Sequence, residues 1–352
     1  MSPLENHNVM QRIQRTSQPL TAALMLPLLL AFTATSCGGT QAQGPNHQGD
    51  PKDAVWGADG KGHERAYADL KHLCEEIGPR RIGTKGLERT RDWMQSILGE
   101  LKGWTVTLDK FEAFPPEGAR RKGPIEGVNV LARREGTKKG EIWIASHYDT
   151  FDKPGFVGAN DAGSSTVVLL ELARQLQGEG PRNGMTIVLC WFDGEELFPG
   201  TDKNGLPLRW DNDTNSTFGS RSLAERMEEN KTIKNIKALV LLDMVGDAKL
   251  GLLKESGSDS RLKQLFESTA ASLGDDGLFV GQQPINDDHL HFRRRNIPAI
   301  DLIDFKFGPN NSYWHTKEDT LENVSANSLA RVGRLVTAAL PRIEKEFGPK
   351  GQ

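Results

Sequence analysis

MTIVLCWFDGEE, residues 185–196, is the stretch on which the fold prediction depends. Residues 185–192 are mostly apolar and include β-branched and aromatic side chains, and the run ends abruptly at Asp193 and Gly194. Such a run, followed by turn residues, is typical of a strand buried on both faces of a sheet. Successive side chains leaving a strand point to opposite sides, so Glu195 and Glu196 can have different roles. An isolated pair of glutamates is more often just a polar loop, so a functional site needs support from elsewhere in the chain.

Strands and helices alternate along most of the sequence. Further strands are expected at 104–114, 128–134, 141–146, 238–242 and 298–303, and helices at 63–77, 84–101, 164–175, 219–229, 259–273 and after Ser325. The first of these strands alternates polar and apolar residues, as an antiparallel or edge strand does, and Thr84 and Ser325 are candidate helix caps. Residues 197–217 are polar and aperiodic, which indicates a surface loop. This order predicts one α/β domain, residues 61–352, with a mostly parallel central sheet and helices on both faces.

The first part of the chain has the pattern of an export signal. Arg12 and Arg15 precede an apolar run and then small residues up to Cys37. We expect residues 1–37 to be a signal peptide of the lipoprotein type, with an ordinary secretory signal as the alternative, and residues 38–60 to be a flexible tether. The expected location is the cell envelope or periplasm, with membrane contact only through a lipid on Cys37.

Composition restricts the possible partners. The formal net charge is −3 over 352 residues and no basic block stands out, so nucleic acid is not an expected partner. Cys74 and Cys190 are the cysteines that remain beyond Cys37. A disulfide between them is possible in an exported protein, but the sequence leaves it open.

Several residues that can bind a metal follow the predicted strands. His147, the Asp193–Glu196 group and Asp243 each end a core strand, Asp161 precedes a buried helix, and His315 follows the last strand. In an open α/β sheet, sites form beyond the carboxyl ends of the strands, so these side chains should converge. Imidazole and carboxylate ligands without thiolate fit a catalytic zinc.

The motifs resemble those of the zinc aminopeptidase family that includes glutaminyl cyclases, from about residue 63 to 345. They are SHYDTF at 146–151, GANDAGSS at 158–165, WFDGEE at 191–196, LLDMVG at 241–246, DDHLHF at 287–292 and YWHT at 313–316. The resemblance implies the zinc ligands Asp161, Glu196 and His315, and a proton-transferring role for Glu195. In the aminopeptidase branch, His147 and Asp243 complete a second metal site.

Several features resemble the cyclase branch. These are FVGA before Asp161, FGSRSLAERM at 218–227, Asp287 in the DDH phrase, and Trp314 directly before His315. The resemblance implies that Asp287 belongs to a hydrogen-bonded network with Glu195 and Asp243, and that Trp314 is a wall of the substrate pocket. Other features depart from animal cyclases. Asp301 stands where they carry a histidine, the loop after Glu196 is longer and offers only Trp210 as a second pocket tryptophan, and Ser146 and Thr166 replace a disulfide.

The resemblance therefore implies a zinc-dependent glutaminyl-peptide cyclotransferase, which converts N-terminal glutamine of peptides or proteins to pyroglutamate and releases ammonia. One zinc ion is expected. The alternative is an aminopeptidase of the same family with two metal ions, and a remote alternative is a binding domain without catalysis. The sequence leaves the natural substrate and the oligomeric state open.

Overall fold

The computed structural model describes residues 56–349. The predicted signal peptide and most of the predicted tether lie outside this range. Trp56 falls within the predicted tether, yet it is only 1% exposed, and its ring fills the space beside Gly333. The packed residues therefore begin before the predicted boundary at residue 61.

A six-stranded sheet forms the centre of the protein, as expected from the alternating elements. Its strands are β1 (Trp104–Ala113), β2 (Ile125–Arg134), β3 (Gly136–His147), β4 (Arg182–Phe192), β5 (Ile236–Asp243) and β6 (Ala299–Ile303). Their order across the sheet is β1-β2-β4-β3-β5-β6. Strands β4, β3, β5 and β6 are parallel, and β2 is antiparallel to both of its neighbours. β1 is the predicted edge strand, and its side chains alternate in burial along part of its length.

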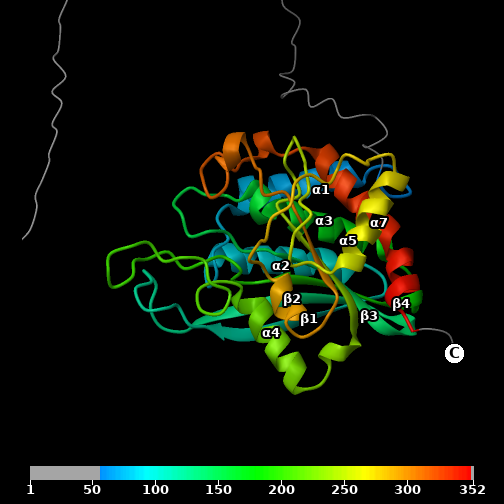
Figure 1. Ribbon diagram of the computed structural model, residues 1–352, viewed down its shortest axis with the longest axis horizontal. Helices are drawn as coiled ribbons and strands as arrows, with labels where there is room; N and C mark the ends of the chain where they lie inside the picture. Colours follow the sequence, from blue (N-terminus) through cyan, green and yellow to red (C-terminus); the bar gives the residue numbers. More distant parts are fainter. Residues whose placement is uncertain (1–55, 350–352) are drawn as a thin grey trace, which may run out of the picture. The chain divides into compact units, whose positions relative to one another are not determined.

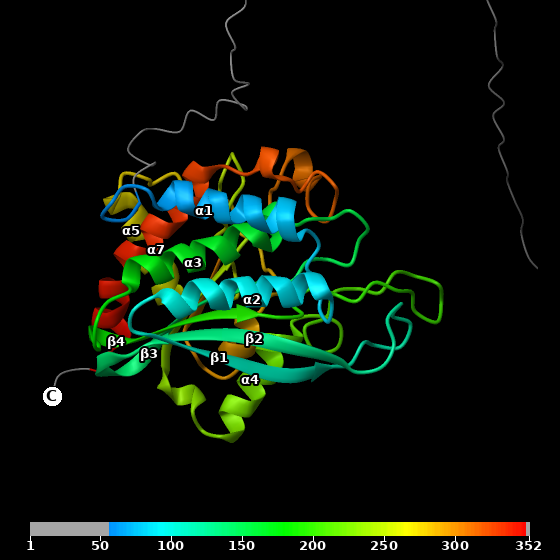
Figure 2. The same ribbon diagram turned by 180° about the vertical axis from the view of Figure 1, so that it is seen from behind.

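Helices cover both faces of the sheet, which confirms the predicted layers (Figures 1 and 2). One face carries α1 (Gly62–Lys71), α2 (Lys85–Glu100), α3 (Ser165–Leu176), α5 (Ser260–Ser272) and α7 (Ala326–Phe347). The other face carries α4 (Phe218–Glu229) and the short α6 (His289–Arg293). Helix α6 was not expected, because five residues are too few to show a helical period.

Strand β4 connects the two cores that the layers create. Leu189 and Trp191 belong to the large core under α1, α2, α3, α5 and α7, whereas Cys190 and Phe192 belong to the smaller core under α4 and α6. Burying each large apolar side chain contributes about 1.5–3 kcal/mol, so the apolar run fixes this strand at the centre of the sheet. Cys190 packs as an apolar side chain and, like Cys74, is not in a disulfide.

The two predicted helix caps behave differently. The Ser325 hydroxyl accepts a hydrogen bond from the Asn327 backbone N–H, as an N-cap does. Thr84 does precede α2, but its hydroxyl instead donates to the Arg81 carbonyl oxygen at 2.6 Å. The prediction of a side-chain cap at Thr84 was therefore wrong, since the preceding turn offers a closer acceptor.

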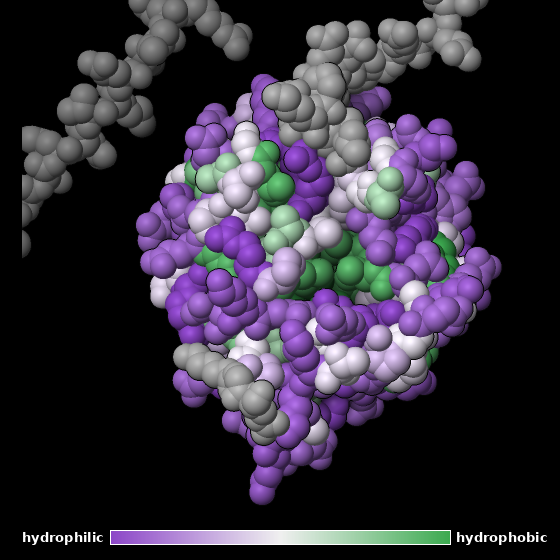
Figure 3. Space-filling view, turned by 90° about the vertical axis from the view of Figure 1, so that its right-hand side faces the viewer, coloured by the Kyte–Doolittle hydropathy of each residue, from purple (hydrophilic) through white to green (hydrophobic). Residues whose placement is uncertain are grey.

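The loop after β4 runs along the loop between β1 and β2, and both extend away from the sheet (Figures 1 and 2). An isolated bridge joins Ala119 to Gly200 across them. The end of the molecule seen in Figure 3 is mostly hydrophilic, with hydrophobic side chains gathered in a hollow near its centre. None of the helices within residues 56–349 is both long and apolar enough to cross a membrane.

Candidate metal and substrate site

The ends of three adjacent parallel strands bring the predicted side chains together. His147 is the last residue of β3, Asp243 is the last residue of β5, and the glutamate pair follows β4. β3 lies between β4 and β5 in the sheet, so His147 stands between the other two groups. This arrangement follows from strand order, and it is the convergence at the carboxyl edge that the sequence predicted.

Asp161 connects two groups of side chains that have the geometry of metal ligands. In the first group, Asp161 Oδ2 lies 3.3 Å and Glu196 Oε2 lies 3.1 Å from His315 Nε2. In the second group, Asp161 Oδ1 and Asp243 Oδ1 each lie 3.2 Å from His147 Nε2. The two oxygens of Asp161 thus face different groups, which is the placement a bridging carboxylate needs.

The crevice has a large excess of negative charge. Asp161, Glu195, Glu196 and Asp243 are each less than a tenth exposed, and none of them forms an ion pair with a lysine or arginine within residues 56–349. Neither Glu196 oxygen has a hydrogen-bond partner among these residues. Burial raises the pKa of Glu196 to about 7, although His315 opposes this shift. For His315, burial alone would lower the pKa, because burial disfavours the charged imidazolium. The facing carboxylates of Glu196 and Asp161 outweigh burial and raise the pKa of His315 to about 10.

These observations test whether a metal ion fits. Buried carboxylates that outnumber their cationic partners are costly, and two imidazoles with several carboxylates form a donor set typical of zinc. A divalent cation would supply the missing positive charge and would occupy the unpartnered Glu196 oxygens. The residues present therefore fit zinc at Asp161, Glu196 and His315, and they leave a second candidate position at His147, Asp161 and Asp243.

Asp149 is a functional residue whose role the sequence reasoning missed. Its Oδ1 accepts the Glu195 backbone N–H at 3.1 Å, and its Oδ2 accepts the Glu196 backbone N–H at 3.3 Å. Oδ1 also lies 3.4 Å from His147 Nδ1. One buried carboxylate therefore fixes the backbone of both glutamates and lies beside the His147 imidazole. Its position inside the SHYDTF motif was the available signal.

Asp319 has the same kind of role beside Asp161. Its two oxygens accept the backbone N–H groups of Asn160 at 2.6 Å and Asp161 at 3.1 Å. Burial, with the Asp161 charge adding to it, raises the pKa of Asp319 to about 8. Sequence reasoning did not identify this residue, because only the folded loop after His315 brings it to Asp161.

A cavity of about 220 Å³ opens beside the first group. It is lined by Asp161, Glu195, Trp210, Asp243, Gln283, Pro284, Ile285, Asn286, Asp287, Ile303, Phe305, Trp314 and His315. Trp314, the predicted pocket wall, and Trp210, the candidate from the long loop, both line this cavity. Two of the proposed ligands, Asp161 and His315, thus line one small cavity together with the proposed proton carrier and both tryptophans.

Three buried carboxyl groups, Glu195, Asp243 and Asp287, face this cavity. Burial raises the pKa of each of them, and neighbouring acidic groups raise the pKa of Glu195 and Asp287 further, whereas His147 opposes the shift at Glu195. No direct hydrogen bond joins the three within the described residues, so the hydrogen-bonded network that the resemblance implied is not present, although all three line the same cavity. Carboxyl groups in this arrangement can hold protons or cationic groups.

Asp301, which stands where animal cyclases carry a histidine, is fully buried. Its Oδ2 lies 3.9 Å from Nδ1 of His289, whose Nε2 lies 3.2 Å from Glu255. Burial and the nearby Asp287 raise the pKa of the Asp301 carboxyl. In this protein the imidazole beside position 301 therefore belongs to His289.

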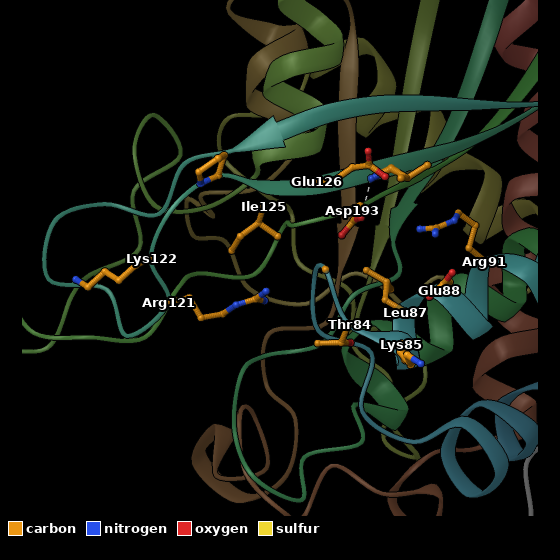
Figure 4. A pocket seen from close by; sticks show the side chains of 13 residues that line it. Thr84, Lys85, Leu87, Glu88, Arg91, Arg121, Lys122, Ile125, Glu126 and Asp193 are labelled. Carbon is orange, nitrogen blue, oxygen red and sulfur yellow. Dashed lines mark hydrogen bonds between the residues drawn. The ribbon is translucent and has the colours of Figure 1, made fainter.

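Asp193 does not join the site, contrary to the grouping of Asp193 with Glu195 and Glu196. Its Oδ2 accepts the Val128 backbone N–H at 2.8 Å, and its side chain faces a separate depression (Figure 4). That depression is lined by α2 and by β2 with the loop before it, including Lys85 and Arg121. Glu195, two positions along the chain, lines the cavity beside the metal site instead.

Comparisons with known proteins agree with this geometry. Residues 129–340 match the sequence model of peptidase family M28. A glutaminyl-peptide cyclotransferase of Boiga dendrophila is 29% identical over 307 residues, which cover 76% of this chain and 77% of that protein. The crystal structure of an Acidobacteriales bacterium glutaminyl cyclase is 31% identical with a TM-score of 0.72, over 81% of this chain and 95% of the other. A Zn-dependent exopeptidase of Parabacteroides distasonis is 25% identical with a TM-score of 0.65, over 81% and 98%.

Proposed function

Because this chain belongs to peptidase family M28, we propose that it is a zinc-dependent enzyme that acts on peptide N-termini as a glutaminyl-peptide cyclotransferase. The observation that carries the proposal is the cavity of about 220 Å³, which Glu195, Trp210 and Trp314 line together with Asp161 and His315 of the first group. The similarity of this chain to a glutaminyl cyclase of known structure, over 81% of its length, supports the same reaction.

The proposed reaction closes a ring within the substrate. The α-amine nitrogen of an N-terminal glutamine bonds to the γ-carboxamide carbon, the bond from this carbon to the amide nitrogen breaks, and ammonia leaves. A zinc ion held by Asp161, Glu196 and His315 would polarise the γ-carbonyl as a Lewis acid.

The chain's own residues move the proton and hold the substrate. Glu195 takes a proton from the attacking amine and returns it to the leaving ammonia, which needs a carboxyl group with a raised pKa. Asp243 and Asp287 line the same cavity and can hold the free α-amine. Trp210 and Trp314 restrict the space to one side chain and exclude water, which would otherwise compete with the amine.

One specific observation favours a second function. The group of His147, Asp161 and Asp243 is complete and buried, as a second metal ion in an aminopeptidase requires. In that reaction, Glu195 would take a proton from an attacking water molecule, and the peptide bond after the first residue would be hydrolysed. A binding domain without catalysis is disfavoured, because every proposed ligand position is filled by a residue that binds metals.

A paired assay distinguishes the two reactions. Purified protein with one equivalent of zinc is given a peptide with N-terminal glutamine and a matched peptide with N-terminal leucine. Ammonia release from the first without cleavage of the second is expected. Rapid release of leucine by protein that contains two metal ions would instead establish the aminopeptidase, and zinc-free protein with full activity would refute both.

We also propose that the protein is exported and attached to a membrane by a lipid on Cys37, which lies outside the described residues. Expression in a bacterium should give membrane-bound protein, and Cys37→Ser should change its processing. Soluble and identically processed protein from both versions would leave an ordinary secretory signal.

A further inference from the structure

His315 differs from His147 in how its ring is held. Both nitrogens of His147 face carboxylates, Nδ1 toward Asp149 and Nε2 toward Asp161 and Asp243. In His315, Nε2 faces Asp161 and Glu196, but no residue within 56–349 forms a hydrogen bond with Nδ1. A histidine that binds a metal is normally oriented by a hydrogen bond at its other nitrogen. Within residues 56–349, the orientation of the His315 ring therefore depends on its other contacts.

Aromatic rings lie against both faces of this imidazole. The ring of Phe151 is 4.1 Å from it between centroids and nearly parallel, at 7°. The ring of Trp314 is 4.2 Å away at 23°. Two rings at this distance and tilt would overlap on one face, so they must lie on opposite faces. Phe156 adds an edge contact to the imidazole at 5.9 Å and 75°.

The segment that carries Phe151 is itself anchored. Thr150 exchanges hydrogen bonds with Arg80, and Asp152 forms an ion pair with Arg81. Lys153 Nζ donates to the carbonyl oxygen of His315 at 2.8 Å. His315 has a φ of +53°, a conformation that costs a residue other than glycine some free energy. Residues 151–153 therefore contact both the ring and the backbone of His315.

From this geometry we propose that Phe151 is a positioning residue that orients the His315 imidazole toward Asp161 and Glu196, and that Lys153 holds the His315 backbone in place. The inference rests on the proposed zinc site, since it concerns the readiness of His315 to bind the ion. Phe151 stacks on the imidazole face and so leaves Nε2 free for the metal. The stacking limits rotation about the side-chain bonds of His315. In other metal sites, a hydrogen bond at Nδ1 has this role.

The test measures zinc affinity directly, by competition with a chromogenic chelator, on the purified full domain. Phe151→Leu keeps an apolar side chain of similar bulk but removes the aromatic face, and Phe151→Tyr keeps the face. Phe151→Leu should weaken zinc binding about tenfold. Phe151→Tyr should keep the zinc affinity within about twofold of the wild type. Phe266→Leu, in the core under α5, is the matched control, because it should lower stability without changing zinc affinity.

Two further measurements keep the inference testable. With Co²⁺ in place of zinc, Phe151→Leu should shift the visible absorption bands, which report ligand geometry, whereas Phe266→Leu should not. If Phe151→Leu fails to fold, Lys153→Met, which removes the bond to the His315 carbonyl, should still weaken zinc binding by roughly threefold.

The possible failures are distinguishable. Wild-type protein that binds no zinc would refute the proposed metal site itself. Wild-type protein that binds zinc, together with unchanged affinity and unchanged Co²⁺ spectra in Phe151→Leu, would overturn only the positioning role. Unchanged affinity in Lys153→Met would likewise overturn the backbone part of the inference.

Discussion

Replacing Asp149 with asparagine should damage the site more than the fold. Asp149 accepts the Glu195 and Glu196 backbone N–H groups with separate oxygens. An asparagine side chain has one acceptor oxygen, so one of these N–H groups loses its partner and meets an NH₂ group instead. A buried donor left without a partner costs about 1–3 kcal/mol, and the free energy of unfolding should fall by about that amount.

The effect on catalysis should be larger than this loss of stability suggests. The backbone of Glu195 or of Glu196 must move to relieve the contact, and a displacement of about 1 Å at a catalytic group costs about 100-fold in rate. We therefore expect kcat/KM for an N-terminal glutamine peptide to fall about 100-fold, which corresponds to about 2.7 kcal/mol of transition-state stabilisation. The assay follows ammonia release at saturating zinc, with urea unfolding measured in parallel.

Asp193→Asn is the matched control. Asp193 also accepts a backbone N–H, that of Val128 in β2, but its other oxygen has no partner, so asparagine can keep this bond. It faces a separate depression, and kcat/KM should stay within about threefold of the wild type. Equal activity of Asp149→Asn and Asp193→Asn, with Asp149→Asn properly folded, would refute the role assigned to Asp149.

Three further predictions follow from the same geometry. His315→Ala should abolish zinc binding, because it removes the imidazole that faces Asp161 and Glu196. Retained zinc would contradict its role as a ligand. His147→Ala should leave one zinc per chain and lower the turnover of an N-terminal glutamine peptide, whereas loss of a metal ion from a two-metal protein would favour the aminopeptidase. Burial raises the pKa of Asp288 to about 7 from an ordinary 3.8, so the stability from this group is complete below about pH 4 and is lost as pH rises through 7. Asp288→Asn should therefore flatten the dependence of metal-free stability on pH between these values, and an unchanged slope would contradict the raised pKa.

The sequence predicted most of the fold because its strongest patterns are hydrophobic. The apolar run at Met185–Phe192 indicated the central strand, and the carboxyl ends of the parallel strands indicated where His147 and Asp243 would meet. Both inferences depend only on burial and on strand direction. They hold in the structure, since β3, β4 and β5 are adjacent and parallel.

What the sequence missed depends on the paths of loops. The contacts of Asp149, Asp319 and Phe151 are made with backbone N–H groups or ring faces that only the folded turns bring into reach. Periodicity carries no information about such contacts, because a turn has no repeating geometry. The direction of Asp193 was misjudged for the same reason, since Gly194 has a φ of +69° and turns the chain between Asp193 and Glu195.

The balance of charge explains why ligand geometry alone does not fix the number of metal ions. Asp161 presents one oxygen to each candidate position, so the same side chains suit one ion or two. A second divalent ion would neutralise the carboxylates around His147, but protons can do so as well, because burial raises the pKa of Glu195, Asp243 and Asp287. A hydrolase needs the second ion to prepare water for attack. A cyclase takes its nucleophile from the substrate, so it needs no second ion to prepare water. Glu195 must be ionised when it takes the proton from the amine. The one-zinc reaction therefore requires only that protons neutralise the neighbouring carboxyl groups that do not accept the amine proton.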